Sequence, residues 1–374
     1  MKKSLKTDAV RTSLAEQGLT QKQLAKDLGV TSQAVTNWLQ GKDFPRPAKL
    51  LKLATALRLS FEELVQTSAK GHPIVAFRKK GNAKTTATHI AKAHGIGMLL
   101  KPLVPYLSEI QALRTLITSP STDYHKLQTA VSQTREHLGV GEQAVLAYEH
   151  LIGEFKNSGA VLVPVLWGAK GSHENALHIG LPEEDITFIF LNLDTHLEDF
   201  KFWMAHELAH VYTPELSGTD EGEDFADAFA GALLFPQACA EQAYHQAIQQ
   251  TNETDTIHAL LQWAIEHMIS LNTVYQKIQQ YAQAHELPGL PVKEKSIHTT
   301  RNSNHGSLIS AALFDPMPPE PKLYIAAYEN TFQSDFFNAM KRMIHETGTG
   351  PSYIQQVLNT SLQDATALHK ELSH

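Results

Sequence analysis

The chain of 374 residues contains one cysteine and no apolar run long enough to span a membrane. A single cysteine excludes an internal disulfide and fits a reducing compartment, so we interpret Cys239 as a passive thiol. The lysine-rich start is not followed by the apolar segment of a secretion signal. We therefore expect a cytoplasmic protein with no membrane partner. The hydrophobic content of 42% suits two or three domains with proper cores.

Positive charge is scarce over the chain as a whole, which carries a formal net charge of −7, but it is concentrated at the start. Residues 1–80 hold 15 Lys and Arg against 6 Asp and Glu, a net charge of +9, which leaves −16 for residues 81–374. A basic first segment on an acidic body suits a polyanion partner for the first segment only.

Residues 20–40 have the spacing of a helix-turn-helix. Residues 21–28 and 32–40 can each form a short helix that is preceded by a capping threonine. Gly29 ends the first helix and tolerates the sharp reversal, and the small Ala25 lets the two helices approach closely. The apolar positions of the pair are Leu24, Leu28, Val35 and Trp38.

Three flanking segments complete a small bundle. Residues 5–16 precede the motif, and residues 47–57 and 61–65 follow it, each with a helical pattern. This five-helix arrangement resembles the XRE-type, lambda-repressor-like DNA-binding domains. The resemblance implies that the partner is a double-stranded DNA operator and that the recognition helix lies in its major groove. Such domains commonly bind paired half-sites, an arrangement that would suit a homodimer.

The recognition helix offers exposed polar side chains that can hydrogen-bond to bases. Among them Gln33 best fits a bidentate contact to adenine. Four basic residues suit phosphate contacts, which set register without reading sequence. The alternatives are a plain solvated surface, or a bundle that binds protein. The base-contact candidates are Ser32, Gln33, Thr36 and Asn37, and the phosphate-contact candidates are Lys22, Lys42, Arg46 and Lys49.

The segment 206–210, His-Glu-Leu-Ala-His, combines metal-ligand spacing with a base. Residues four apart lie on one face of a helix, so the imidazoles of His206 and His210 can meet at one ion. Glu207 would then stand beside the open coordination position as the general base. The context is helical: Thr195 is a candidate N-cap, and Pro214 stops the pattern.

A second helical run follows at residues 223–236 and supplies a third ligand. Glu223 near its start is predicted to point at the two histidines, and Asp227, one turn later, to hydrogen-bond the outer nitrogen of one of them. Two His and one Glu make a catalytic zinc set, with one Zn²⁺ per chain. Three neighbouring acidic residues are alternatives to Glu223 as the third metal ligand. Asp227 is also interpretable as a surface acid. The three alternatives are Asp220, Glu221 and Asp224.

At these residues the chain resembles the ImmA/IrrE family of zinc metallopeptidases. The shared pattern is H-E-x-x-H, then E-x-x-A-D-x-F-A and L-L-F-P, with strands expected at residues 160–166, 176–179 and 186–193. The resemblance implies a gluzincin-like site on His206, His210, Glu223 and Glu207. The family usually has Asn where this chain has Asp227. Tyr212 is interpretable either as a packed tyrosine or as a donor to a developing oxyanion.

These patterns predict a mainly α protein with a small β-sheet (α+β). We divide it into a helix-turn-helix domain at 1–70, a helical linker or dimerisation region at 71–138, a peptidase domain at 139–290 and a C-terminal region of unknown role at 291–374. Residues 74–77 have a strand pattern. We expect a connector that bears Pro, Lys and Ser at 287–304, and a strand at 323–327 followed by two helices.

Two functions fit the patterns. The first is a DNA-binding regulator with a zinc endopeptidase domain, whose protein substrate is a repressor of the helix-turn-helix class in a stress or mobile-element response. This substrate class is implied by the family resemblance. The second is a transcription factor or antitoxin-like repressor whose peptidase fold acts as a non-catalytic sensor.

Overall fold

The computed structural model describes residues 2–39, 43–68, 73–76, 87–108, 116–168 and 175–374. The chain forms two compact units, Met1–His72 and Pro73–His374. Helices dominate both, and the second unit contains a four-stranded sheet, which confirms the predicted α+β class. The boundaries predicted inside residues 73–374 stay predictions. None of the described helices is long and apolar enough to cross a membrane.

The first unit is the expected helical bundle around one apolar core. A two-stranded ribbon was not expected: β1 (Lys2–Leu5) pairs antiparallel with β2 (Val65–Ser68), and Leu5 lies opposite Val65. The sequence patterns at 5–16 and 61–65 predict helix at both residues, so the structure differs here. The two ends of the bundle lie side by side, so their backbones can pair with each other. The helices are α1 (Thr7–Glu16), α2 (Gln21–Leu28), α3 (Ser32–Leu39), α4 (Pro47–Leu57) and α5 (Phe61–Leu64).

Local signals at the helix-turn-helix act as predicted. Thr20 forms a capping box with Gln23, whose backbone N–H donates to the Thr20 hydroxyl at 3.2 Å. Gly29 ends α2 in the left-handed conformation with φ of 62°. The hydroxyl of Thr31 accepts from the backbone N–H of Ala34 at 3.1 Å and so caps α3.

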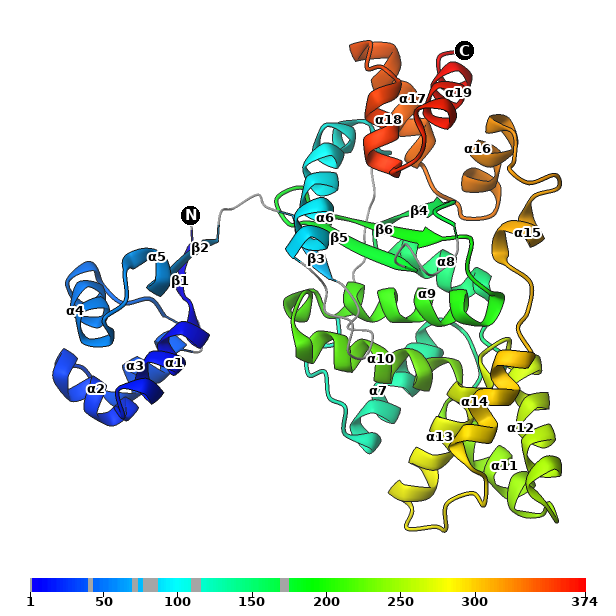
Figure 1. Cartoon of the computed structure of the whole chain (residues 1–374), viewed down its shortest axis with the longest axis horizontal. Helices are drawn as coiled ribbons and strands as arrows, with labels where there is room; N and C mark the ends of the chain where they lie inside the picture. Colours follow the sequence, from blue (N-terminus) through cyan, green and yellow to red (C-terminus); the bar gives the residue numbers. More distant parts are fainter. Residues whose placement is uncertain (1, 40–42, 69–72, 77–86, 109–115, 169–174) are drawn as a thin grey trace. The chain divides into compact units, whose positions relative to one another are not determined.

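The sheet of the second unit has the strand order β3-β5-β6-β4. Strands β4 (Ala160–Val165), β5 (Ala176–Leu181) and β6 (Ile186–Asn192) confirm three predicted strands, and β3 (Ile74–Ala76) confirms the fourth. β4 runs parallel to β6, whereas β5 is antiparallel to both β6 and β3. The helix α9 (Leu197–Tyr212) runs along one face of this sheet, and α10 (Asp220–Leu234) packs against α9 (Figure 1).

Two helix starts differ from the prediction. The residue before α9 is His196 rather than Thr195, and it makes no side-chain cap. Thr195 instead belongs to a loop in which its carbonyl accepts from the backbone of Ile309 at 3.0 Å. α10 starts at Asp220, three residues before Glu223, because Thr219 caps it through the backbone N–H of Gly222.

The C-terminal region is helical and differs from three predictions. The expected connector contains α14 (Glu294–Ser303), and the expected strand at 323–327 lies inside α16 (Pro321–Asn330). Pro321 starts that helix, and Tyr324 and Tyr328, one turn apart, are both buried. Three helices follow in place of the two expected. They are α17 (Phe336–Thr347), α18 (Pro351–Leu358) and α19 (Leu362–Leu372).

This region packs onto the sheet rather than standing apart. The hydroxyl of Tyr324 donates to the carbonyl of Pro164 in β4 at 2.7 Å, and Tyr328 donates to the same carbonyl. Ser334 donates to the carbonyl of Leu162 at 2.5 Å. These bonds satisfy backbone acceptors on the outer edge of β4 and cover that edge.

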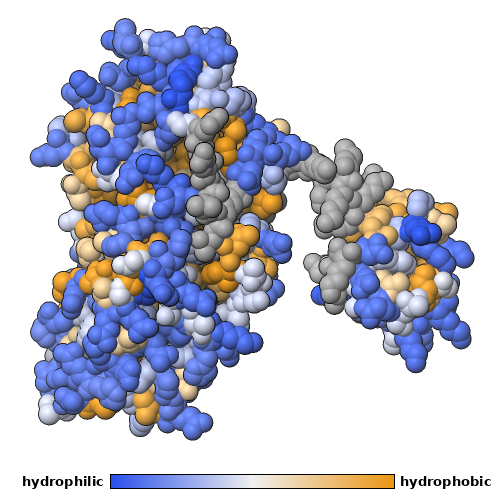
Figure 2. All heavy atoms as spheres, turned by 180° about the vertical axis from the view of Figure 1, so that it is seen from behind, coloured by the Kyte–Doolittle hydropathy of each residue, from blue (hydrophilic) through white to orange (hydrophobic). Residues whose placement is uncertain are grey.

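The remaining helices complete the second unit, whose surface is largely hydrophilic on the face shown in Figure 2, with scattered apolar groups. They are α6 (Ala87–Leu100), the 3-10 segment η1 (Lys101–Tyr106), α7 (Tyr124–His137), α8 (Tyr148–Asn157), η2 (Pro214–Leu216), α11 (Gln237–Ile248), α12 (Glu253–His267), α13 (Leu271–Ala284) and α15 (Ile309–Leu313).

Candidate metal centre and DNA interface

The predicted metal ligands come together between α9 and α10. The Nε2 atoms of His206 and His210 lie 3.2 Å apart, as expected for residues one turn apart. Glu223 faces both rings: its Oε2 lies 3.5 Å from Nε2 of His206, and its Oε1 lies 3.3 Å from Nε2 of His210. Each of the three residues offers a ligand atom within 4.8 Å of the others.

This cluster is buried and strongly polar. His206 and His210 are each 1% exposed and Glu223 is 7% exposed. Burial favours a neutral His206, but its contacts with Asp227 and Glu223 outweigh burial and raise its pKa to about 9. Burial likewise opposes ionisation of Glu223, but the two histidines lower its pKa to about 2. The site therefore stabilises a buried negative carboxylate through adjacent positive charge.

The same atoms suit a divalent cation. Apart from the two imidazoles, neither carboxylate oxygen of Glu223 has a hydrogen-bond donor among the described residues. Two imidazole nitrogens and one carboxylate are the protein donor set of many catalytic zinc sites. The residues present therefore fit a zinc ion.

Asp227 stands behind His206. Its Oδ1 lies 2.9 Å from Nδ1 of His206, on the side of the ring opposite the cluster. When His206 is neutral, a carboxylate there favours the tautomer with the proton on Nδ1, which leaves the lone pair of Nε2 directed at Glu223 and His210. Although 38% of the Asp227 side chain is exposed, this contact is as close as a charge-assisted hydrogen bond.

Glu207 lies on the sheet side of α9, where it meets His178 of β5. Its Oε2 is 3.5 Å from Nδ1 of His178, and both side chains are buried. Burial lowers the pKa of His178, against the opposing effect of Glu207. Sequence reasoning missed His178. The available signal was a lone imidazole inside the otherwise apolar run Leu177 to Ile179.

A cavity of about 140 Å³ opens beside this pair. Its lining combines His178 and Gly180 of β5 with Ile74 of β3 and the segment that joins α9 to α10. From that connecting segment Pro214 and Ser217 line the cavity. The cavity therefore places β3 and β5 next to the histidine that contacts Glu207.

Tyr212 is a packed tyrosine. Its hydroxyl donates to Oε1 of the buried Glu154 at 2.9 Å, and the side chain is fully buried. Ser158 also donates to that oxygen at 3.0 Å. The hydroxyl of Tyr212 therefore satisfies an internal carboxylate, which favours the structural interpretation over a role at an oxyanion.

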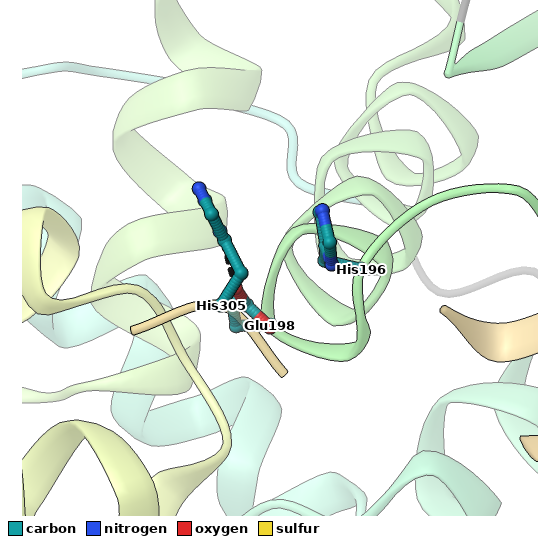
Figure 3. Close-up of side chains that lie close together, drawn as sticks. All are labelled: His196, Glu198 and His305. Atoms are coloured by element: carbon teal, nitrogen blue, oxygen red, sulfur yellow. Dashed lines mark hydrogen bonds and ion pairs between the residues drawn. The ribbon is translucent and has the colours of Figure 1, made fainter. Parts of the chain in front are cut away.

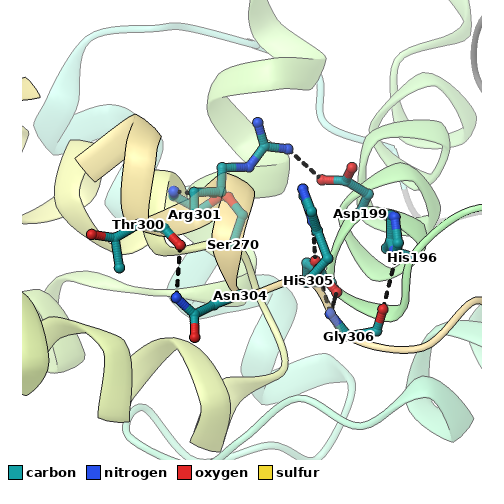
Figure 4. Close-up of polar contacts among 10 residues, drawn as sticks. His196, Asp199, Ser270, Thr300, Arg301, Asn304, His305 and Gly306 are labelled. Carbon is teal, nitrogen blue, oxygen red and sulfur yellow. Dashed lines mark hydrogen bonds and ion pairs between the residues drawn. The ribbon is translucent and has the colours of Figure 1, made fainter. Parts of the chain in front are cut away.

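A second histidine group lies at the start of α9 (Figure 3). The rings of His196 and His305 stack with centroids 4.5 Å apart, and Glu198 lies beside them. Each ring has a partner for Nδ1. Nδ1 of His196 lies 2.7 Å from the carbonyl oxygen of Gly306 (Figure 4). Nδ1 of His305 lies 3.0 Å from Oε1 of Glu198. These hydrogen bonds explain the group as a connection between the C-terminal segment and α9, so the buried cluster is the stronger candidate for a metal.

The predicted DNA-contact residues of α3 lie on its exposed side. Ser32 and Gln33 are exposed, and Thr36 and Asn37 are partly exposed. The side-chain amide of Gln33 donates to Oδ1 of Asn37 at 3.0 Å, so the two present a joined polar surface. Val35, Trp38 and Leu39 of the same helix are buried.

The basic candidates separate into two groups. Lys22 and Arg46 are exposed, as a phosphate contact requires, whereas Lys42 lies outside the described residues. The ammonium group of Lys49 donates hydrogen bonds to the carbonyl oxygens of Leu28 at 2.6 Å and Gly29 at 3.1 Å. Lys49 therefore stabilises the C-terminal end of α2, which favours a structural role over a phosphate contact.

Two family models match separate parts of the chain. Residues 10–64 match the helix-turn-helix family model, and residues 169–279 match the family model of the IrrE N-terminal-like domain. The second match contains every residue of the buried cluster, together with His178. No curated protein matches the chain significantly.

Proposed function

We propose that this chain, a fusion of an XRE-type helix-turn-helix domain with an IrrE-like metallopeptidase domain, is a DNA-binding regulator whose second unit is a zinc-dependent endopeptidase. The observation that carries the proposal is the approach of His206, His210 and Glu223 to within 4.8 Å, with Glu207 on the same helix. We assign one Zn²⁺ per chain to these three ligands.

A zinc ion bound there would polarise a peptide carbonyl and promote the ionisation of water. Glu207 would accept a proton from the attacking water and deliver it to the amine that leaves when the peptide bond breaks. His178 holds the carboxylate of Glu207 from the sheet side at 3.5 Å. Asp227 favours the tautomer of His206 in which Nε2 presents a lone pair to the ion.

The proposed substrate is a protein, and a helix-turn-helix repressor is the class we favour. The fusion supports this choice because a DNA-binding first unit brings the peptidase to operators, where such repressors are concentrated. Its partners are then a double-stranded operator and a repressor-type protein in the cytoplasm, in a stress or mobile-element response. Paired half-sites would suit a homodimer.

The peptidase proposal is tested with Glu207→Gln in the full chain, incubated with zinc and purified repressors. We expect cleavage to fall by about 10²- to 10⁴-fold, as for loss of a general base, while the zinc content stays at one per chain. Glu221→Gln is the matched control, because Glu221 is exposed on α10 and does not belong to the cluster. Equal cleavage by wild type and Glu207→Gln would disprove the assignment. Stoichiometric zinc without any cleavage would favour the non-catalytic sensor.

The DNA-binding proposal is tested on the exposed side chains of α3. Gln33→Ala should cost about 1–3 kcal/mol of binding to the preferred operator and relax the preference at one base position. Lys22→Ala should instead weaken binding to all sequences equally and reduce the salt dependence. Identical effects of both changes on specific and non-specific DNA would contradict the assigned roles.

A further inference from the structure

The short strand β3 occupies the outer edge of the sheet beside Glu207. It pairs antiparallel with β5, with Ile74 opposite Gly180 and Ala76 opposite His178. β3 is the outermost strand in the order β3-β5-β6-β4, so β5 would be the edge without it. The segment that pairs there directly follows the DNA-binding unit in the sequence.

The outer edge of β5 is the surface on which an extended polypeptide would meet Glu207. β5 packs against α9, and its His178 touches Glu207 at 3.5 Å. An edge strand presents a row of backbone N–H and C=O groups, and an added strand gains affinity from pairing with them. A chain that pairs at His178 is therefore held alongside the proposed base.

The residues around β3 pack closely against it. The carbonyl of Val75 lies 3.0 Å from where a Cβ on Gly218 would stand, and Gly218 has φ of +77°, which favours glycine. On the other side, a Cβ on Gly97 of α6 would approach Pro73 to 2.5 Å. The glycines at positions 97 and 218 therefore let α6 and the segment that joins α9 to α10 approach Pro73 and Val75 closely.

We infer that Ile74–Ala76 occupies the position of a substrate strand, so that the peptidase is blocked by its own chain until this segment leaves β5. The inference rests on the proposed function and specifies its substrate as an extended segment that pairs with β5. A tethered strand has an effective concentration on the order of 1 mM, so a substrate at about 10 µM with equal intrinsic affinity would occupy about 1% of the edges.

A reversible covalent lock tests this inference in the full chain. A Cβ on Gly180 would lie 3.8 Å from the Cβ of Ile74, which is the usual separation in a disulfide. The double variant Ile74→Cys/Gly180→Cys can therefore fix β3 on β5 when oxidised and release it when reduced. The native Cys239 is fully buried, so it does not compete. The single variant Ile74→Cys, treated identically, controls for the oxidant.

The first readout is cleavage of fluorescently labelled casein, used as an unfolded polypeptide. We expect the oxidised double variant to cleave at least tenfold more slowly than the same protein after reduction, with equal zinc content in both states. Measurable cleavage at equal rates in the two states would overturn the inference.

The second readout does not depend on turnover. The lock is combined with Glu207→Gln, and binding of the same casein is measured by fluorescence anisotropy. The oxidised form should bind at least tenfold more weakly than the reduced form. Equal binding, including no binding in either state, overturns the inference. A difference in binding combined with no cleavage by any form would disprove the peptidase proposal and leave the role of β3 standing.

Discussion

The contact between Asp227 and His206 gives a quantitative test of the metal centre. Their atoms Oδ1 and Nδ1 lie 2.9 Å apart, so Asp227 contacts the ring whose Nε2 faces the cluster. Loss of such an outer partner typically weakens metal affinity by about 10- to 100-fold, which equals about 1.4–2.7 kcal/mol. Asp227→Ala should therefore weaken zinc binding by that factor.

Asp227→Asn separates the hydrogen bond from the charge. The amide oxygen of Asn can still accept from Nδ1, so this variant should lose less than tenfold in zinc affinity. The measurement is competition with a chromophoric zinc chelator, carried out on the full chain at fixed pH. Zinc affinity within twofold of wild type in Asp227→Ala would refute the reasoning. Equal losses in both variants would show that the charge, and not the hydrogen bond, stabilises the site.

Two further predictions concern the scaffold around the site. Burial, with a smaller contribution from nearby Arg135, lowers the pKa of Lys201 to about 8, although it donates to the carbonyl of His267 at 2.7 Å. Between pH 8 and 10.5 the folded state then binds fewer protons than the unfolded state. The free energy of unfolding of the wild type should therefore rise with pH in this range. The expected rise, measured relative to the variant Lys201→Met, is on the order of 1–3 kcal/mol. A pH-independent difference in urea denaturation would contradict this. Tyr212→Phe removes a hydrogen-bond donor to the buried Glu154, so it should lower the free energy of unfolding by about 1–3 kcal/mol and leave kcat unchanged. A large loss of kcat at unchanged stability would instead favour Tyr212 as a donor to the developing oxyanion.

The sequence predicted the parts of the site that depend on helical spacing. His206 and His210 are four residues apart, and Glu223 and Asp227 are four residues apart, so each pair shares a helix face in any α-helix. The helix-turn-helix was predictable for the same reason, because Thr20 and Gly29 act on their own neighbours.

Features that depend on long-range contacts escaped prediction. The contact between His178 and Glu207 requires β5 to lie on α9, and no local pattern specifies that packing. The expected strand at 323–327 is apolar enough for either class of element, and its helical state follows from the burial of Tyr324 and Tyr328 against β4. The ribbon that joins Leu5 to Val65 likewise depends on the bundle bringing its two ends together.

The central claim is that one zinc ion is held by His206, His210 and Glu223, and anomalous scattering tests it most directly. Crystals of the full chain grown with one equivalent of zinc should show a single peak at the zinc edge, about 2.0–2.2 Å from both Nε2 atoms and from a carboxylate oxygen of Glu223. A zinc peak at His196 and His305 with none at the buried cluster would contradict the account.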